Sequence, residues 1–357
     1  MQIELPEKTI NVTAHTIKAA LKNPVKSAQV VNLVYVKEGE KGIRRVKKGK
    51  SFTYTRNGKQ IKNKVLLERI ARLVIPPAWK DVWICDKENG HLQCTGIDVR
   101  GRKQYRYHPS WNVLRKQTKF YRMLQFGEGL EQLRKKLSRD LGKQGLNKQK
   151  VLAAIVATMD RTGIRVGNEM YEKMYGSYGL STLEDRHIDI KGSQVSFSFV
   201  GKKGIHQKIS LKSQRLAKII RDCKEIPVKE LFQYLDDEGK RHSIHSEDVN
   251  NYIKEISGGE FTSKDFRTWV GTVHCMESLI ALGEFETKKQ LKKNTIDALD
   301  KVAAFLGNTR TVCKSHYVHP MILTMYEEGG LKKFMKQRRT SGASASEARL
   351  LKLLKKS

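Results

Sequence analysis

The pattern of apolar residues changes near Asn112, and this change divides the chain into two dissimilar parts. Before Asn112, short alternating segments are separated by turn signals such as the pair Asn57 and Gly58, which is typical of strands. After Asn112, apolar residues recur at helical spacing as far as about Leu306. The sequence therefore predicts an α+β protein in which a small β-rich N-terminal domain precedes a larger, mainly α-helical domain.

In the first part we expect strands at residues 30–36, 51–55, 81–85 and 91–96. Residues 65–74 carry apolar side chains at helical spacing, and this helix should stop before Pro76.

In the second part we expect helices at residues 120–141, 148–160 and 263–281. A β-hairpin of residues 194–200 and 205–211 interrupts them, with lysines at its tip. The predicted domains are a partly mobile extension over 1–28, the β-rich domain over 29–112, the helical domain over 113–339 and a basic tail over 340–357.

Positive charge is spread over the whole chain. Lys and Arg number 69 against 37 Asp and Glu, which gives a formal net charge of +32. The excess is +14 before about residue 112 and +18 after it, so both parts attract a polyanion. An enzyme that wraps a nucleic acid and a non-catalytic nucleic-acid binder fit this distribution equally well.

The five cysteines form no CxxC pair, and free thiols in a reducing compartment are expected. No apolar run approaches the roughly 18 residues of a membrane span. The N-terminus lacks the basic and apolar regions of a secretion signal. These features predict an intracellular protein that does not enter a membrane.

Cofactor motifs are absent from the sequence. Residues 49–51 (Gly-Lys-Ser) look like the end of a P-loop, but Arg44 occupies the position of the required first glycine. There is no HExxH motif, no metal-spaced His/Cys cluster and no evident acidic pair for Mg²⁺. We therefore expect no cofactor, and the protein itself must supply the positive charge for any cleavage of a nucleic acid.

Four segments of the second part could supply that charge. They are residues 162–171 (TGIRVGNEMY), 199–204 (FVGKKG), 263–269 (SKDFRTW) and 306–309 (LGNT), the last of which precedes Tyr317 in the stretch SHYVHP. In this order and at these separations they resemble type IB DNA topoisomerases of the bacterial and poxvirus kind. Residues 49–54 (GKSFTY), 73–85 (LVIPPAWKDVWIC) and 101–108 (GRKQYRYH) are similar to the same family, so the resemblance runs from about residue 30 to about residue 335.

The resemblance implies a monomeric enzyme that holds supercoiled double-stranded DNA between its two domains in a C-shaped clamp. Such an enzyme nicks one strand through a 3′-phosphotyrosine, lets the strand rotate and reseals it, without ATP or metal. It also implies a cytoplasmic location of bacterial type, associated with the nucleoid.

The resemblance assigns Tyr317 as the nucleophile, with Arg165 and Arg267 on the non-bridging phosphate oxygens. A phenol of pKa ~10 needs nearby positive charge or a proton acceptor to react at neutral pH, and the sequence does not show which is present. A guanidinium offers planar paired donors and a lasting charge, which suit a five-coordinate phosphorus.

Lys202 is implied as the general acid that protonates the leaving 5′ oxygen, with Lys203 as its immediate rival. The family pattern places this lysine directly after the glycine, which favours Lys202. The next position in the family is often Asp, and Lys203 departs from that.

Asn308 stands where eukaryotic and poxvirus members carry histidine and where bacterial members can carry asparagine. Its amide could donate a hydrogen bond to a non-bridging oxygen, or it could cap the helix end after Gly307. His316 and His319 are interpreted as packing or phosphate contacts.

Several other residues are implied to touch DNA, because they match DNA-contacting family positions and mix basic with aromatic groups. The alternative for each is a solvated surface. They are Arg102, Lys103, Gln104, Tyr105, Tyr107 and Tyr171.

Two other functions stay open at this point. A tyrosine recombinase shares the arginine–lysine–tyrosine chemistry but acts as a tetramer, and the topoisomerase-like N-terminal region disfavours it. A non-catalytic nucleic-acid binder is disfavoured because every expected catalytic position is occupied.

Overall fold

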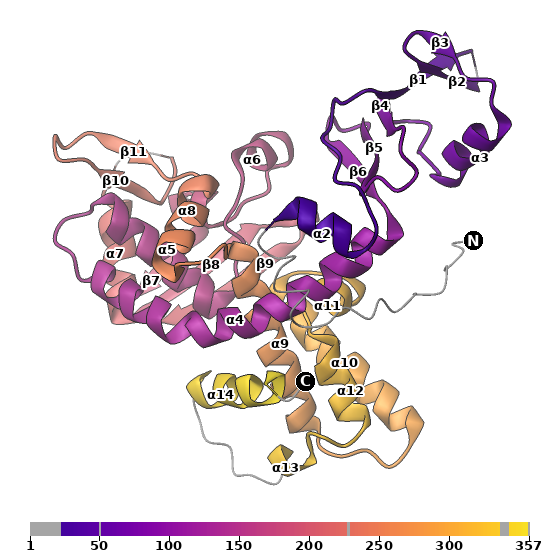
Figure 1. Ribbon diagram of the computed structural model, residues 1–357. Helices are drawn as coiled ribbons and strands as arrows, with labels where there is room; N and C mark the ends of the chain where they lie inside the picture. The colour runs from indigo at the N-terminus through magenta and orange to yellow at the C-terminus, as the bar shows by residue number, and fades with distance from the viewer. Residues whose placement is uncertain (1–22, 50, 227–228, 336–342, 356–357) are drawn as a thin grey trace. The chain divides into compact units, whose positions relative to one another are not determined.

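The computed structural model describes residues 23–49, 51–226, 229–335 and 343–355 (Figure 1). Its contacts divide the chain into two compact units, Met1–Arg122 and Met123–Ser357. The first is built around a sheet and the second is mainly helical, as the α+β prediction requires. Most of the predicted N-terminal extension lies outside the described residues. None of the described helices is both long and apolar enough to cross a membrane.

The first unit contains a six-stranded antiparallel sheet in the order β3-β2-β1-β4-β5-β6. The predicted hairpin turn is confirmed, because Asn57 and Gly58 have φ angles of +49° and +77° between β2 and β3. The strands are β1 Gly42–Lys48, β2 Ser51–Arg56, β3 Lys59–Gln60, β4 Lys80–Cys85, β5 Leu92–Ile97 and β6 Lys103–Tyr107.

Helix α3 (Lys64–Arg72) covers part of this sheet and confirms the predicted helix. Asn63 begins it, because its side-chain oxygen accepts a hydrogen bond from the Leu66 amide at 3.0 Å. On the inner side Ile70 joins Ile43 and Ile84 in a buried cluster, which ties the helix to the strands.

The strand predicted at residues 30–36 is wrong. Its first residue ends helix α2 (Pro24–Val30), which begins with a capping Asn23 and a proline in the first turn. Asn32 then takes a left-handed φ of +56°, and Val34 makes only an isolated bridge to Gly90. Val31 and Leu33 instead bury against the start of the long helix α4, in a cluster with Ala28, Trp111 and Leu114, while Val36 packs with Trp83, Cys85 and Leu92 of the sheet.

The second unit is a helical core with a three-stranded sheet at its side. The predicted hairpin is confirmed as β8 (Gln194–Val200) and β9 (His206–Lys212), which pair along their full length. The sequence did not predict β7 (Ile188–Lys191), the third strand of this sheet, or the small pair β10 (Gln233–Leu235) and β11 (Arg241–Ser243). These strands have only three or four residues, too few for a clear alternation.

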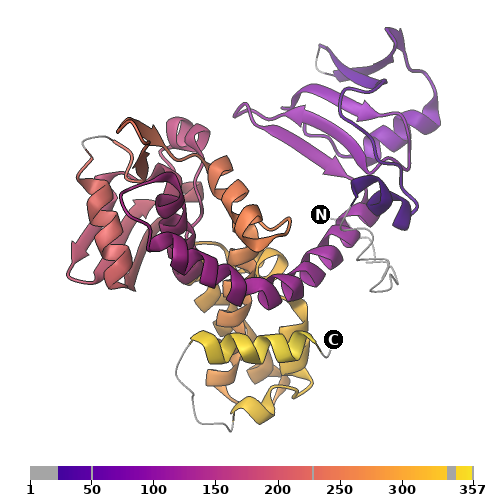
Figure 2. The same ribbon diagram turned by 60° about the vertical axis from the view of Figure 1, so that its left-hand side comes forward.

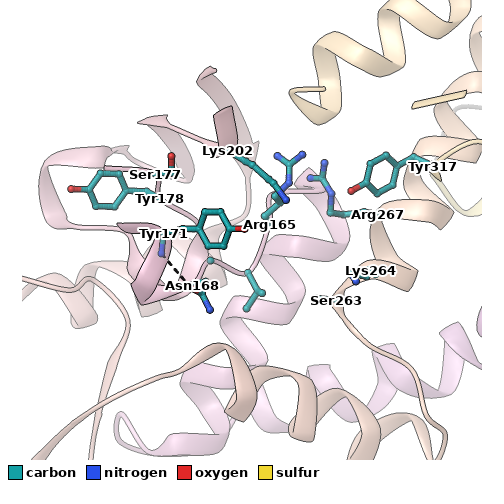
Figure 3. A pocket seen from close by; sticks show the side chains of 12 residues that line it. Arg165, Asn168, Tyr171, Ser177, Tyr178, Lys202, Ser263, Lys264, Arg267 and Tyr317 are labelled. Carbon is teal, nitrogen blue, oxygen red and sulfur yellow. Dashed lines mark hydrogen bonds between the residues drawn. The ribbon is translucent and has the colours of Figure 1, made fainter. Parts of the chain in front are cut away.

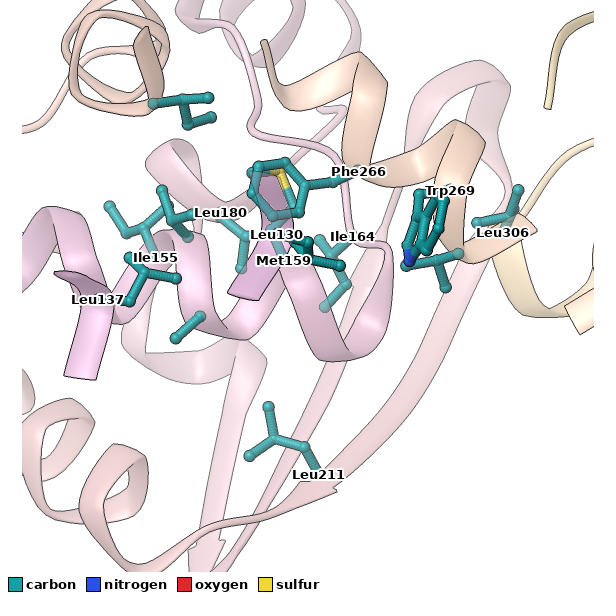
Figure 4. Packing of buried hydrophobic residues seen from close by; sticks show 14 of the residues in the cluster. Leu130, Leu137, Ile155, Met159, Ile164, Leu180, Leu211, Phe266, Trp269 and Leu306 are labelled. Atoms are coloured by element: carbon teal, nitrogen blue, oxygen red, sulfur yellow. The ribbon is translucent and has the colours of Figure 1, made fainter. Parts of the chain in front are cut away.

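Helix α5 lies at the centre of the unit, and its residues from Val151 to Met159 are all buried (Figure 4). Phe266 and Trp269 of α9 pack in the same core. The predicted helices are confirmed, although the first starts about ten residues earlier than expected. The helices are α4 Pro109–Leu141, which begins in the first unit, α5 Lys148–Thr162, α6 Glu169–Tyr175, α7 Gln214–Lys224, α8 Ser246–Ser257, α9 Ser263–Leu282, α10 Lys288–Leu306, α11 Arg310–His316, α12 Pro320–Glu327, α13 Lys332–Met335 and α14 Ala343–Leu354.

Candidate active site

Arg165 is fixed by the end of α5. Gly163 stops the helix in a left-handed conformation (φ +63°), and its amide donates to the Met159 carbonyl at 2.8 Å. The chain then leaves the helix, and the Leu180 amide donates to the Arg165 carbonyl at 2.9 Å. The backbone on both sides of Arg165 is therefore tied down, which leaves the side chain to point into the site.

Arg267 comes from the first turns of α9 and is only 3% exposed. Its Nη1 donates to the carbonyl of Gly163, and its Nη2 donates to the carbonyl of Leu306 at 2.9 Å. These carbonyls lie at the C-terminal ends of α5 and α10, where helix carbonyls lack partners and the helix dipoles favour a cation. Two helix ends thus hold a buried guanidinium without neutralising it.

Asn308 follows the end of α10 and serves Arg165. Its Oδ1 accepts a hydrogen bond from Arg165 Nη2 at 2.6 Å. The left-handed residue at the helix end is Gly307 (φ +58°), where a Cβ would come within 1.9 Å of the Gln207 side chain. The helix cap therefore belongs to Gly307, and Asn308 orients the arginine. Its amide nitrogen lies 3.5 Å from the Leu306 carbonyl.

Tyr317 lies at the end of α11 and faces the two arginines. Thr272 of α9 donates to the Tyr317 carbonyl at 3.2 Å, which anchors the backbone. The Cζ of Arg267 lies 5.0 Å from the centroid of the phenol ring. Figure 3 shows the hydroxyl directed toward the guanidinium groups of Arg165 and Arg267.

The charges around Tyr317 favour its reactive form. Burial raises the pKa of this phenol, but Arg267, Arg165 and Lys202 together outweigh burial and lower the pKa below its ordinary value. Burial also lowers the pKa of Arg267, to about 10, and Arg165 adds to this effect. Arg267 still stays charged at neutral pH, so the site offers a standing positive field to a phenolate or a phosphate.

Lys202 reaches the same site from the tip of the β8–β9 hairpin. Gly201 and Gly204 close the turn, because the Gly204 amide donates to the Gly201 carbonyl at 3.1 Å. The Lys202 Nζ lies 5.6 Å from the centroid of the Tyr171 ring. Desolvation and the neighbouring Arg165 lower the pKa of Lys202, in the direction that a proton donor working near neutral pH requires.

Two adjoining hollows meet at this group, and Arg165, Lys202 and Tyr317 line both. Lys203 lines only the second hollow, so the geometry favours Lys202 over its rival. Lys264 lines the first hollow, although sequence reasoning gave it no role. Its position three residues before Arg267 on one helix face was a signal that could have identified it.

Comparisons with known proteins agree with this geometry. A family model described as "Eukaryotic DNA topoisomerase I, catalytic core" matches residues 108–341, and one described as "Bacterial DNA topoisomerase IB, N-terminal domain" matches residues 51–98. DNA topoisomerase 1B of Acanthamoeba polyphaga mimivirus is 32% identical over 295 residues, which cover 80% of this chain and 88% of that protein. DNA topoisomerase 1B of Vaccinia virus (strain Copenhagen) is 24% identical over 239 residues, which cover 65% and 72%.

The chain belongs to the type IB DNA topoisomerase family. It is therefore an isomerase that acts on DNA, as the sequence predicted. The two alternative functions, a tyrosine recombinase and a non-catalytic nucleic-acid binder, are not supported. The match to the catalytic core contains all five residues that the sequence singled out for chemistry. In this topoisomerase they converge from the ends of α5, α10 and α11, the start of α9 and one hairpin tip.

The residues in β6, and Arg102 just before it, that have an implied DNA contact are in the first unit, and several already have protein partners. Arg102 forms an ion pair with Asp98 at 2.7 Å, and Gln104 donates to the same carboxylate at 2.9 Å. Lys103 pairs with Glu38 at 2.5 Å. Tyr105 and Tyr107 stack at 6.1 Å between centroids.

Tyr171, the other residue with an implied DNA contact, lies on α6 in the second unit and lines the first hollow. The histidines beside Tyr317 have different surroundings. His319 begins α12 and its Nδ1 accepts from the Met321 amide at 3.1 Å, while His316 lines the second hollow. A packing role therefore suits His319, and His316 stands where a phosphate contact is feasible.

Proposed function

We propose that this topoisomerase relaxes supercoiled duplex DNA by transient cleavage of one strand through Tyr317. The observation that carries the proposal is the direction of two pKa shifts at one point. The pKa values of Tyr317 and Lys202 are both lowered, which favours the phenolate nucleophile and makes the Lys202 ammonium a stronger proton donor, and the two groups line the same hollows beside Arg165.

In the cleavage step, the Tyr317 oxygen attacks a backbone phosphorus and the bond to the 5′ oxygen breaks. Lys202 gives its proton to that leaving oxygen, which becomes a 5′ hydroxyl. The DNA keeps a 3′ phosphate joined to the tyrosine. Resealing reverses each step, with Lys202 taking the proton from the attacking 5′ hydroxyl and the phenolate leaving.

The arginines stabilise the phosphorus while it has five oxygen neighbours. Arg165, oriented by Asn308, and Arg267, held by the helix ends, contact the non-bridging oxygens, where extra negative charge develops. Because these partners are neutral oxygens, the guanidinium charges stay available to the phosphate. The Asn308 amide nitrogen adds a hydrogen bond but no charge.

We also propose that the two units close around the duplex as a C-shaped clamp and that one protomer is sufficient. Basic charge on both units supports contact with DNA from two sides. The bond energy is kept in the phosphotyrosine, so neither ATP nor a divalent metal takes part. The proposed location is the nucleoid of a bacterial-type cytoplasm, and the five cysteines, all free and buried, suit a reducing compartment.

The test is relaxation of supercoiled plasmid in EDTA without ATP, with Tyr317→Phe beside the wild type. We expect the wild type to relax both signs of supercoil and the variant to form no covalent adduct. Tyr178→Phe is the matched control, because Tyr178 lines the same hollow but donates to Glu184 at 3.2 Å. It should keep the adduct.

The polarity of the adduct is checked with end-labelled duplex. After denaturation, the 5′-labelled part of the cleaved strand should stay on the protein, because the tyrosine holds its 3′ end. Full relaxation by Tyr317→Phe, or retention of the 3′-labelled part, would contradict the mechanism.

A further inference from the structure

The C-terminal helix α14 (Ala343–Leu354) is part of the catalytic unit. Leu350, Leu353 and Leu354 are buried at 4% exposure or less, in the same core as α5 and α9. Figures 1 and 2 both show α14 lying against α9. The match to the topoisomerase catalytic core ends at residue 341, so α14 lies beyond the matched segment. The basic tail expected from the sequence is, in its described part, a packed helix.

Glu347 is a charged residue that α14 turns inward, as is Arg349. One carboxylate oxygen accepts from the indole nitrogen of Trp269 at 2.9 Å. Both oxygens accept from Arg134, at 2.6 and 2.8 Å. The side chain of Glu347 is only 12% exposed. Three hydrogen bonds fix this carboxylate, and two of them are charge-assisted.

Arg134, on α4, links Glu347 to α5. Its guanidinium makes a second bidentate pair with Asp160, at 2.8 and 2.9 Å. Asp160 lies in the last turn of α5 and its side chain is 9% exposed. One arginine is therefore clamped between a carboxylate of α5 and a carboxylate of α14.

The two branches from Glu347 end beside the two arginines of the active site. Through Arg134 it reaches Asp160, three residues before the Gly163 carbonyl that holds Arg267 and five before Arg165. Through Trp269 it reaches α9 two residues after Arg267. Glu347 thus links α9, which carries Arg267, to the end of α5, which precedes Arg165. These two elements must keep their relative positions if both arginines are to contact one phosphate.

Trp269 transmits this constraint because it has little room to move. It is fully buried, and a Cβ added at Gly127 would come within 2.4 Å of its ring. Any tilt of the indole would carry α9 with it. A displacement of about 1 Å at a catalytic group can lower a rate by about 100-fold, because orientation supplies much of the rate enhancement.

We propose that Glu347 is a positioning residue, which sets Arg165 and Arg267 for phosphate contact through Arg134 and Trp269. This rests on the proposed catalytic roles of the two arginines. The leucines of α14 already pack in the core, and a partly buried ion cluster adds less stability than apolar packing would. The carboxylate therefore contributes geometry at the active site, which leucines cannot specify.

The experiment compares Glu347→Gln with Glu277→Gln in the full chain. Glu277 is on α9, like Trp269, and pairs with Arg349 of α14 at 3.1 Å. The control therefore breaks a link between the same two helices and leaves the contacts of Trp269 and Arg134 in place. For each variant we measure thermal unfolding by circular dichroism. At a temperature at which the variant is folded, we then measure its affinity for duplex DNA and its rate of single-turnover cleavage, on a duplex whose leaving strand dissociates after cleavage.

We expect Glu347→Gln to slow cleavage by about 10- to 100-fold and to change duplex affinity by less than about 3-fold, while Glu277→Gln stays near the wild type in both. Combining Glu347→Gln with Arg267→Lys should cost less than the product of the two single effects, because both act on one contact. Glu347→Asp, which keeps the charge, should recover part of the rate.

Equal loss of rate in both glutamine variants, or multiplicative effects with Arg267→Lys, would reduce α14 to a structural helix and overturn the proposal. So would a Glu347→Gln protein that cleaves within about 2-fold of the wild type. These outcomes are separate from failure of the mechanism itself, which would appear as a wild type that forms no adduct at Tyr317.

Discussion

Arg267 and Arg134 lie in the same unit, and both are held by several hydrogen bonds, but their partners differ in charge. Arg267 donates to two neutral carbonyls at helix ends, and Arg134 donates to the carboxylates of Asp160 and Glu347. The first arrangement fixes a guanidinium and leaves its charge available, and the second cancels the charge. The kind of partner therefore distinguishes an arginine whose charge is available to a phosphate from one whose charge is already cancelled.

The largest expected contrast is between alanine substitutions of these two arginines. Arg267→Ala should slow cleavage by about 1000-fold, since a preorganised donor to the developing charge is lost. Its free energy of unfolding should change by only about 1 kcal/mol, because the lost hydrogen bonds are offset by removal of an uncompensated buried charge.

Arg134→Ala should show the reverse pattern. It leaves two carboxylates unpaired, and the free energy of unfolding should fall by about 2 to 3 kcal/mol, while cleavage falls less than in Arg267→Ala. Denaturant unfolding and single-turnover cleavage check both variants. The comparison breaks if the two proteins lose rate and stability in the same proportion.

Lys202 and Lys203 allow a second contrast, between neighbours on one hairpin tip. Lys202→Ala should slow cleavage by about 100-fold, and Lys203→Ala by only a few-fold. A substrate with sulfur in place of the leaving 5′ oxygen should restore the Lys202→Ala rate, because a thiol of pKa ~8.5 leaves without a donated proton. If sulfur gives no recovery, Lys202 is not the general acid.

Arg165→Gln should move the pH dependence of cleavage to higher pH on both sides. Arg165 lowers the pKa of Tyr317 and that of Lys202, so its removal raises both. The rate rises with pH as the phenol loses its proton, and it falls as the lysine loses its proton. Both changes should then occur at higher pH. Arg161→Gln removes the same charge outside the two hollows and should leave the profile in place. A lower rate with an unshifted profile would limit Arg165 to phosphate contact.

The smallest expected effect concerns β6, where cations are already paired. Glu38→Gln frees Lys103, and we expect duplex DNA to bind up to about 5-fold more tightly, since an exposed ion pair is weak and the released ammonium can then contact a backbone phosphate. Glu68→Gln, on α3 in the same unit, makes the same charge change away from Lys103. Equal affinities for the two variants, measured at several salt concentrations, would argue against a DNA contact by Lys103.

Much of the fold could be read from local patterns. The Asn57–Gly58 turn, the hairpin with Lys202 at its tip and the helix that carries Arg267 depend on residues close together in the chain, and all three were predicted. The strand at residues 30–36 failed because Val31 and Leu33 pack in a cluster with Trp111, about 80 positions away. Short strands such as β7 failed because three or four residues carry too little pattern.

The candidate site divides in the same way. The sequence by itself determined the family, because the order and spacing of four short segments identify it, and it named the arginines, lysine and tyrosine that we propose to carry the chemistry. Only the tertiary structure decided the contacts around them: that helix-end carbonyls hold Arg267, that Asn308 accepts from Arg165, and that Glu347 joins α14 to Arg134 and Trp269. Those contacts link residues 39 to 213 positions apart, and such pairings arise from packing of the whole unit rather than from any local pattern.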